Sequence, residues 1–178
     1  MSSTLFHSLE SEHLCFKQLD LSDAMDIHEF ASDENVSKYI GWPLMYSLEE
    51  TQAFVNELIN KEKAKTHLYA GVVDKGTGCV IGSVVLFSFD EEANNAEIGY
   101  VFSSSVWGKG YGSEAVGLVT DFGLKVLGLH KINARVVAPN IGSSKVLLKH
   151  GYVQEGQLRD YYYIDHQYYD CLFYGKIK

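Results

Sequence analysis

The alternation of strand and helix patterns between residues 96 and 150 constrains the fold of this chain more than any other feature. Runs of apolar and β-branched residues predict strands, and apolar residues at helical spacing predict helices. In order along the chain, they predict a strand at 96–102, a helix ending near 127, a strand at 131–137 and a short helix at 141–150. A strand that returns after a helical crossover pairs in parallel with the first. We therefore expect a parallel pair of strands in the middle of a sheet.

The flanking segments add further strands and helices to this unit. Strand patterns occupy residues 14–19, 68–73, 79–89, 152–164 and 168–177. Helix patterns occupy residues 47–63, with a capping box from Ser47 to Glu50, and a segment that Ser22 or Asp23 would cap and that runs to 32. The expected fold class is α+β: a single domain over residues 1–178, with a mixed, mostly antiparallel sheet of seven strands and helices on both faces.

The composition excludes several classes of protein. Apolar residues make up 46% of the 178 residues and charged residues 21%, as in ordinary globular proteins, and no apolar run is long enough to cross a bilayer. The formal net charge of −8 argues against nucleic acid as the main partner, and suits either a cationic substrate or simply a well-solvated surface. No signal-peptide pattern occurs, so we expect a cytoplasmic protein without a membrane partner.

The cysteines and histidines do not form a metal-binding pattern. Cys15, Cys79 and Cys171 lie far apart in strand-like segments, so neither a CxxC pair nor a disulfide framework can be drawn, and we expect buried, reduced thiols. The seven histidines show no ligand spacing either. The sequence therefore predicts no metal and offers no cysteine nucleophile.

A glycine-rich turn, VWGKGYGSEA at residues 106–115, leads from the predicted strand at 96–102 into the next helix. Its three glycines in five positions allow the backbone to approach a ligand closely. The first turn of a helix also has amides without partners at the positive end of the helix dipole. Turns of this composition can instead serve only to reverse the chain. By itself, the motif predicts either a phosphate-binding turn or a simple reversal.

Six motifs spread along nearly the whole chain occur in the same order as in one known family. They read YIGWPL, VIGSVVLF, AEIGYVF, VWGKGYGSEA, GLHKINARVVAPNIGSSKVLLKHGY and EGQLRDYYYIDHQYYDCLFY. The chain resembles the GNAT superfamily of acetyl-CoA-dependent N-acetyltransferases, and most of all the RimJ/RimL-like branch that acetylates the N-termini of ribosomal proteins. The resemblance implies the GNAT fold, in which the sheet splays between parallel strands 4 and 5 and acetyl-CoA lies in the gap.

The resemblance assigns the cofactor site to two segments. Backbone amides of the turn would bind the pyrophosphate of acetyl-CoA, namely those of Gly108, Lys109, Gly110, Tyr111, Gly112 and Ser113. Trp107 stands where the family usually has Gln or Arg, so we expect main-chain contacts there and a buried, anchoring role for the indole ring. Asn140 and Ser143 either cap the short helix or face the cofactor, and the resemblance favours a hydrogen bond from Asn140 to the pantetheine arm.

The implied reaction is direct attack of an amine on the acetyl thioester, without a covalent enzyme intermediate. Glu97 matches the general base of the histone-acetylating branch and would act directly or through one water. Many relatives protonate the departing thiolate with a tyrosine at the position of Leu147, so here either Ser143 donates or the thiolate leaves unaided. A backbone N–H at the end of the fourth strand would polarise the thioester carbonyl: that of Val101, Phe102 or Ser103.

Alternation along the fourth strand predicts which side chains share a face. Glu97, Gly99 and Val101 fall on one face, and the intervening residues 98, 100 and 102 fall on the other. If the first face lines the cleft, Gly99 leaves space beside the acid for a ligand or water. An ordinary solvated strand glutamate is the alternative interpretation of Glu97.

The acceptor is expected to contact the loop at 33–47 and the last hairpin. The aromatic candidates are Trp42, Tyr46, Tyr161, Tyr162 and Tyr163. We single out Trp42, Glu97 and Tyr163 as substrate-binding residues. The hairpin turn has Asp165 and His166 where relatives often have Asn-Gly or Asp-Gly, so either His166 takes a positive φ or the turn is of another type.

The kind of acceptor amine stays open between two enzyme hypotheses. An α-amine has an ordinary pKa of about 7.7 to 8.0 and a lysine amine one of about 10.4, so an N-terminal substrate demands less of a base. The leading hypothesis is the N-terminal α-amine of a protein or peptide, and the alternative is a small amine such as a polyamine. A non-catalytic acetyl-CoA-binding module and a purely structural protein are the competing classes. The sequence allows a monomer or a homodimer.

Overall fold

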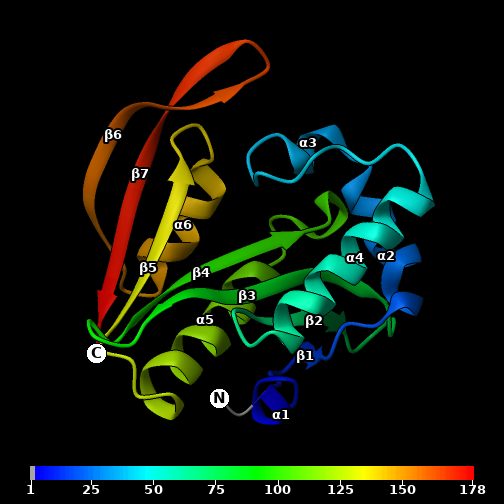
Figure 1. Cartoon of the computed structure of the whole chain (residues 1–178), viewed down its shortest axis with the longest axis horizontal. Helices are drawn as coiled ribbons and strands as arrows, with labels where there is room; N and C mark the ends of the chain where they lie inside the picture. The colour runs from blue at the N-terminus through cyan, green and yellow to red at the C-terminus, as the bar shows by residue number, and fades with distance from the viewer. Residues whose placement is uncertain (1–2) are drawn as a thin grey trace.

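The computed structural model describes residues 3–178 and contains the predicted parallel pair in the middle of a seven-stranded sheet (Figure 1). Strand β4 (Asn95–Phe102) pairs in parallel with β5 (Lys131–Val137) only from Asn95 to Glu97. Beyond Glu97 these two strands no longer pair, and they diverge toward their carboxyl ends (Figure 1). The predicted splay between strands 4 and 5 is confirmed.

All other neighbouring strands pair antiparallel. The order across the sheet is β1-β2-β3-β4-β5-β7-β6. The other strands are β1 (Leu14–Lys17), β2 (Leu68–Asp74), β3 (Val80–Asp90), β6 (Val153–Ile164) and β7 (Gln167–Ile177). In Figure 1 the β6–β7 hairpin, coloured orange and red, rises beyond the ends of the other strands. The mixed, mostly antiparallel α+β architecture that the sequence predicts is therefore confirmed.

Helices cover both faces of this sheet. Helices α2 (Ala24–Ala31) and α4 (Leu48–Lys63) pack on one face, whereas α5 (Tyr111–Asp121) and α6 (Ile141–Lys149) pack on the other (Figure 1). Each pair of helices encloses its own apolar core against the sheet. Burial of these apolar side chains is the main driving force that holds the helices on the strands.

Strand β4 contributes side chains alternately to the two cores. Ile98 and Phe102 pack with α5 and α6, whereas Val101 packs with α2 and α4. The predicted alternation is confirmed, since successive side chains of a strand point to opposite faces. The face that carries Glu97 and Gly99 is therefore the face on which α2 and α4 lie.

Several single-turn elements were not predicted. Helices α1 (Ser3–Phe6) and α3 (Glu34–Ser37) span four residues each. Two 3₁₀ turns, η1 (Leu21–Asp23) and η2 (Ser104–Val106), span three. Elements this short do not repeat a hydrophobic period, so the pattern that predicts longer helices is absent from them.

Capping interactions determine where the longer helices begin. Ser47 and Glu50 form the predicted capping box at the start of α4. Ahead of α2, however, the capping side chain is that of Asp20, which accepts from the Ser22 amide while Asp23 closes the box. Asp23 is the N-cap residue of α2, as one of the two predicted alternatives has it, but its side chain makes no capping hydrogen bond to α2 because it closes the box of the η1 turn.

The helix after the glycine-rich turn ends where the sequence predicts. Helix α5 passes into one π-helical turn, η3 (Phe122–Val126), and Gly128 follows with a φ of 73°. At Gly123, a Cβ would lie 2.7 Å from Ile132 Cδ1, so any larger residue would require the Ile132 side chain to shift.

The predicted burial of the thiols is only partly correct. Cys171 is buried, but Cys15 is half-buried and Cys79 is exposed. Cys79 lies in the turn just before β3, where its side chain faces solvent rather than a core.

The turn between β6 and β7 shows which of the two predicted alternatives applies to His166. Ile164 pairs with Gln167, and both intervening residues have positive φ, 48° at Asp165 and 63° at His166. Two successive positive φ values are typical of a type I′ hairpin turn. The predicted positive φ at His166 is confirmed.

Candidate active site

A cleft of about 830 Å³ opens where β4 and β5 diverge. The end of β4 forms its floor, and its walls come from the loop around α3, the glycine-rich turn and α6. The predicted site residues that line it are Val101, Phe102, Gly108, Gly110, Gly112, Ser113, Asn140 and Ser143. The charged residues that line it are three lysines: Lys38, Lys145 and Lys149. The structure thus gathers most of the predicted cofactor residues around one cleft.

The glycine-rich turn presents free backbone amides to this cleft. Gly108 and Gly110 have φ values of 74° and 89°, and Gly110 is the N-cap of α5. A Cβ at either position would meet no atom within 4 Å, so the turn leaves open space beside the backbone. Within the described chain, the amides of 108–113 donate to no backbone acceptor. Such amides at a helix N-terminus bind anions.

Two residues of the turn lie outside the cleft lining. The side chain of Lys109 is exposed, so it lies near the turn only as a surface charge. Tyr111 packs against the core under α5 and meets the imidazole of His13 edge to face, with ring centroids 6.3 Å apart. Their contributions to an anion site are therefore those of their backbone amides.

The first turn of α5 is also tied to the start of β1. Glu114 accepts hydrogen bonds from Ser11 Oγ and His13 Nδ1, each at 2.7 Å. The hydrogen bond to the Glu114 carboxylate raises the pKa of His13. These contacts fix the N-terminal end of α5, from which the free amides project.

Trp107 anchors the turn, but not by burial. Its indole is 53% exposed, and its Nε1–H donates to the carbonyl oxygen of Phe102 at 3.0 Å. The predicted buried ring is therefore wrong. The indole N–H explains the difference, because a main-chain acceptor at the end of β4 satisfies it at the surface.

A contact between Ser113 and His150 could not be read from the sequence. Ser113 Oγ and His150 Nε2 lie 2.9 Å apart, and they join the first turn of α5 to the end of α6. Burial lowers the pKa of His150, which keeps its imidazole neutral at pH 7. The two helices that border the cofactor cleft are thus linked directly.

Asn140 caps α6, which is one of the two roles that the sequence predicts for it. Its Oδ1 accepts from the backbone amide of Ser143 at 3.2 Å. The Nδ2 group makes no hydrogen bond within residues 3–178, and the residue lines the cleft. The cap therefore uses the acceptor half of the side chain and leaves the donor half available to a ligand.

Tyr100 is a cleft residue that sequence reasoning did not single out. Its hydroxyl lies 2.6 Å from Ser143 Oγ and 3.3 Å from the Ser143 carbonyl oxygen. Burial raises the pKa of the phenol well above its ordinary value. The contact crosses the gap between β4 and α6, so it places a second hydroxyl beside Ser143.

The backbone amides at the end of β4 are not equivalent. The Ser103 amide donates to the Ile81 carbonyl at 2.8 Å, so it is not available to polarise a thioester. Amides alternate in direction along an antiparallel strand, so the Phe102 amide points away from β3 and toward the gap. Of the three predicted candidates, Phe102 has the amide that faces the cleft.

Glu97 lies beside the cleft rather than in its lining. Its Oε1 accepts from Arg135 Nε at 2.8 Å, and Arg135 also donates from Nη1 to the Tyr161 hydroxyl at 3.3 Å. The hydrogen bond to Glu97 raises the pKa of the guanidinium. Glu97 is therefore held in an ion pair on the sheet face that carries α2 and α4.

The side chain of Leu147, at the position where many relatives have a catalytic tyrosine, does not point into the cleft. Its side chain is fully buried in the core under α5 and α6. The neighbouring cleft residue on the same helix is Val146, one position earlier. A hydroxyl at position 147 would lie in the apolar core, so Ser143 and Tyr100 are the hydroxyl groups of the cleft near the cap of α6.

The predicted aromatic acceptor residues do not converge on the cleft. Trp42 packs in the core of α2 and α4, with its ring centroid 6.2 Å from Phe30 and 4.6 Å from Phe54. Tyr163 is exposed on β6, with its ring 4.8 Å from that of Tyr168. Neither lines the cleft.

A different aromatic pair lies where the predicted loop meets the last hairpin. Tyr39, which lines the cleft just after α3, meets Tyr169 of β7 edge to face with ring centroids 6.0 Å apart. This contact joins the loop around α3 to the long hairpin that faces it in Figure 1. The predicted loop and hairpin thus do border the cleft, but through residues that the sequence did not single out.

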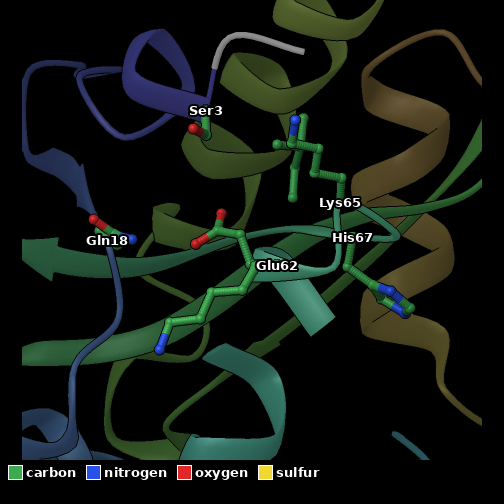
Figure 2. Close-up of a pocket in the computed structure, with 7 residues that line it drawn as sticks. Ser3, Gln18, Glu62, Lys65 and His67 are labelled. Carbon is green, nitrogen blue, oxygen red and sulfur yellow. The ribbon is translucent and has the colours of Figure 1, made fainter. Parts of the chain in front are cut away.

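A second, smaller pocket of about 220 Å³ lies beside α1, the end of α4 and the start of β2 (Figure 2). Figure 2 shows the Glu62 side chain directed toward Ser3, with the His67 ring turned away. The Glu62 carboxylate accepts from His7 Nε2 at 2.9 Å. Its acidic group is therefore already engaged in a hydrogen bond, and the larger cleft is the better candidate for catalysis.

Two features are absent from residues 3–178. No group of three or more histidine, cysteine or carboxylate side chains there is placed to hold a metal ion. In the same range, every helix is too short or too polar to span a membrane.

Comparison with known proteins identifies the family of the chain. Residues 13–153 match the family model described as the acetyltransferase (GNAT) domain. The chain belongs to the GNAT family of acetyltransferases. It is 30% identical over 174 residues, 98% of either chain, to the uncharacterized N-acetyltransferase YoaA of Bacillus subtilis (strain 168).

Solved structures of this family have the same fold as this GNAT enzyme. The ribosomal-protein-S5-alanine acetyltransferase of Vibrio fischeri is 28% identical, with a TM-score of 0.80 over 96% of each chain. The spermidine N-acetyltransferase of Vibrio cholerae, solved with CoA and spermine, has a TM-score of 0.81 at 22% identity, over 94% of this chain and 96% of that one. The chain is accordingly an N-acetyltransferase that uses acetyl-CoA as its acetyl donor. The free amides of the turn and the lysines of the cleft fit the phosphate groups of this cosubstrate.

Proposed function

We propose that this enzyme acetylates the N-terminal α-amine of a protein or peptide by direct attack on acetyl-CoA. The charge of the cleft carries the proposal: three lysines line it, and among the described residues no aspartate or glutamate does. A neutral amine is required for attack. At pH 7 roughly a tenth of an α-amine is neutral, but only a few parts in ten thousand of a lysine-like amine. A cleft without its own carboxylate therefore suits an α-amine better than a strongly basic one.

The donor half of the reaction uses backbone groups and one side-chain amide. The free amides of 108–113 bind the pyrophosphate, and Asn140 Nδ2 donates to the pantetheine arm. The Phe102 amide polarises the thioester carbonyl as negative charge develops on its oxygen. Ser143, one helical turn from the cap, donates to the sulfur. Each of these groups lines or borders the one cleft between β4 and α6, which supports the assignment.

We assign proton removal to Glu97 acting through water. Glu97 lies four positions before Val101, a separation of about 13 Å along a strand, which is too far for direct transfer. Gly99 lies between them on the same face, but the side chains of Val85 and Phe87 already fill the space beside it, so the water chain would run over these side chains toward the cleft. The ion pair with Arg135 holds one carboxylate oxygen and fixes the orientation of the group.

A polyamine is the second candidate acceptor. The net charge of −8 attracts cations, and the spermidine N-acetyltransferase of Vibrio cholerae has the same fold. Two carboxylates on the sheet face of Glu97, however, already have cationic partners in this chain: Glu97 pairs with Arg135, and Glu155 pairs with Lys131 at 2.6 Å. The observations therefore favour the peptide.

The test measures CoA release from acetyl-CoA with a panel of peptides that differ in their first residue, and with spermidine. Each peptide has a matched control that contains an internal lysine and a blocked N-terminus. We expect turnover with free N-termini and none with the blocked peptides. Turnover with blocked peptides, or with spermidine alone, would contradict the proposal.

The role of Glu97 is tested with the same peptides. Glu97→Gln keeps a hydrogen-bond acceptor for Arg135 but cannot take a proton. We expect it to bind CoA normally and to lower kcat by about 10²-fold or more. Glu155→Gln, which breaks the neighbouring ion pair on the same face, is the control and should leave kcat unchanged. Equal rates for Glu97→Gln and the wild type would exclude Glu97 as the base.

A further inference from the structure

The Tyr100–Ser143 pair is the closest contact between two hydroxyl side chains in the cleft. The two oxygens lie 2.6 Å apart, although one residue comes from β4 and the other from α6. Both side chains line the cleft. The pair thus bridges the gap in which the pantetheine arm is expected to lie.

The direction of this hydrogen bond follows from chemistry. A phenol is more acidic than an aliphatic alcohol, so the Tyr100 O–H is the better donor and Ser143 Oγ the better acceptor. Burial raises the pKa of Tyr100, so the phenol keeps its proton at neutral pH. Either hydroxyl can donate in the 2.6 Å contact, and Tyr100 can also donate to the Ser143 carbonyl oxygen at 3.3 Å. We take the shorter contact, to Oγ, as the one in which the more acidic phenol donates.

The hydroxyl hydrogen of Ser143 is then left without a partner on its own helix. In a helix, serine often donates back to the carbonyl four residues earlier. Here that carbonyl, of Pro139, accepts from the Ile141 amide at 2.9 Å, and no bond from Ser143 Oγ to it is formed within the described chain. When Tyr100 donates to Ser143 Oγ, the Ser143 hydroxyl is free to donate into the cleft.

We propose that Tyr100 is a positioning residue that turns the Ser143 O–H toward the sulfur of CoA, so that the two hydroxyls form a donor chain ending on the departing thiolate. In the step itself, the amine nitrogen forms the C–N bond and the C–S bond breaks. The electron pair goes to sulfur, where the Ser143 hydrogen bond stabilises it. Tyr100 and Ser143 keep their protons. The amine proton leaves through Glu97 and water, and the thiolate takes its proton from solvent.

This arrangement accounts for the leucine at position 147. Position 147 is a buried leucine, so α6 supplies Ser143 rather than a tyrosine to the thiolate, and Tyr100 of β4 orients Ser143 from the opposite side. The inference rests on Ser143 lying beside the sulfur, but it is independent of the acceptor amine.

The thiol of bound CoA provides a test that needs no acceptor. A hydrogen bond from Ser143 should hold the pKa of the bound thiol below its ordinary value of about 8.5, because it stabilises only the thiolate. The titration follows the ultraviolet absorbance of the thiolate in the CoA complex, with the complex of desulfo-CoA as blank. We expect Tyr100→Phe and Ser143→Ala each to raise the bound thiol pKa by about one unit.

The double variant Tyr100→Phe/Ser143→Ala should match Ser143→Ala alone, because Tyr100 acts only through Ser143. Ser143→Thr keeps the hydroxyl and should titrate like the wild type. Tyr152→Phe is the matched control: its hydroxyl also contacts a hydroxyl, that of Thr120, at 2.9 Å, but inside the core. It should lower stability and leave the thiol pKa unchanged.

A structural role for Tyr100 predicts a different outcome. Tyr100→Phe would then weaken the binding of desulfo-CoA and leave the thiol pKa at the wild-type value. That result, or additive shifts in the double variant, overturns the proposal. If Tyr100→Phe does not fold, equal thiol pKa values for Ser143→Ala and Ser143→Thr overturn it as well. Since no acceptor is present, failure here is distinct from failure of the peptide assay.

Discussion

The indole Nε1–H of Trp107 donates to the carbonyl oxygen of Phe102 at 3.0 Å, and this bond ties the glycine-rich turn to the end of β4. The amide and the carbonyl of Phe102 point toward the same side of the strand, as those of one residue do in an antiparallel ladder. The residue that we propose to polarise the thioester is thus held by the residue before the turn that we propose to bind the pyrophosphate. Trp107 stands where the family usually has Gln or Arg, and its indole N–H connects the turn to the main chain of β4.

Trp107→Phe should loosen this connection. Phenylalanine keeps an aromatic ring but is smaller than the indole and has no N–H donor, so we expect CoA to bind about 3- to 10-fold more weakly, as loss of one neutral hydrogen bond implies. Calorimetric titration with CoA measures the change. Trp42→Phe is the control, because Trp42 packs between Phe30 and Phe54 and should affect unfolding but not CoA affinity. Wild-type affinity in Trp107→Phe would show that the bond does not organise the turn.

Asn140→Asp separates the two roles of Asn140. Aspartate caps a helix as well as asparagine does, so the free energy of unfolding should stay the same. The Nδ2 donor is lost, however, and we expect CoA affinity to fall about tenfold. Asn140→Ala loses both groups, so it should lower stability by about 1 kcal/mol as well as affinity. Equal CoA affinity in Asn140→Asp and the wild type would mean that the side chain is only a cap.

Gly110→Ala and Gly142→Ala should change stability in opposite directions. Gly110 has a φ of 89°, so alanine there should lower the free energy of unfolding by about 1 kcal/mol through backbone strain alone. Gly142 lies in α6, where the nearest atom to an added Cβ is 3.9 Å away. Alanine at that position should stabilise the helix by up to about 1 kcal/mol. Urea unfolding without CoA measures both, and a neutral result for Gly110→Ala would show that the turn adapts without cost.

The fold could be predicted from the sequence where a helix or strand carries a repeated apolar pattern or a cap within its own residues. The capping box at Ser47 and the apolar spacing of residues 48–63 lie within one helix, and the crossover from β4 to β5 follows from the order of the elements. The four-residue helices α1 and α3 have no period to detect, so they were missed. Local pattern therefore predicted the sheet and the glycine-rich turn, but not the short elements that border the cleft.

The side-chain chemistry of the site was harder to predict because it depends on tertiary contacts. Tyr100 and Ser143 are 43 residues apart in the chain, and they meet only because β4 and β5 separate. The ion pair of Glu97 with Arg135 also spans 38 residues, between neighbouring parallel strands. Residue type and alternation identified Glu97 as a candidate, but its partner is determined by the register of the two strands.

The contact of His13 with Glu114 predicts how stability depends on pH. The carboxylate raises the pKa of His13 above its ordinary value of 6.5, so the imidazolium is bound more tightly in the folded chain than in the unfolded one. The stabilisation is complete below about pH 6.5 and is lost as the pH rises through the raised folded value. The pair therefore supports the start of α5 at mildly acidic pH and not at alkaline pH.

His13→Gln removes this charge but can still donate to Glu114. We expect the melting temperature of the wild type to exceed that of His13→Gln below pH 6.5, and the difference to shrink steadily as the pH rises. Thermal melts of both proteins between pH 5.5 and 8.5, without CoA, measure it. Because the imidazole is exposed, added salt should reduce the difference at low pH. A difference that is constant over this pH range, or one that grows with pH, would show that the charge of His13 does not stabilise the start of α5.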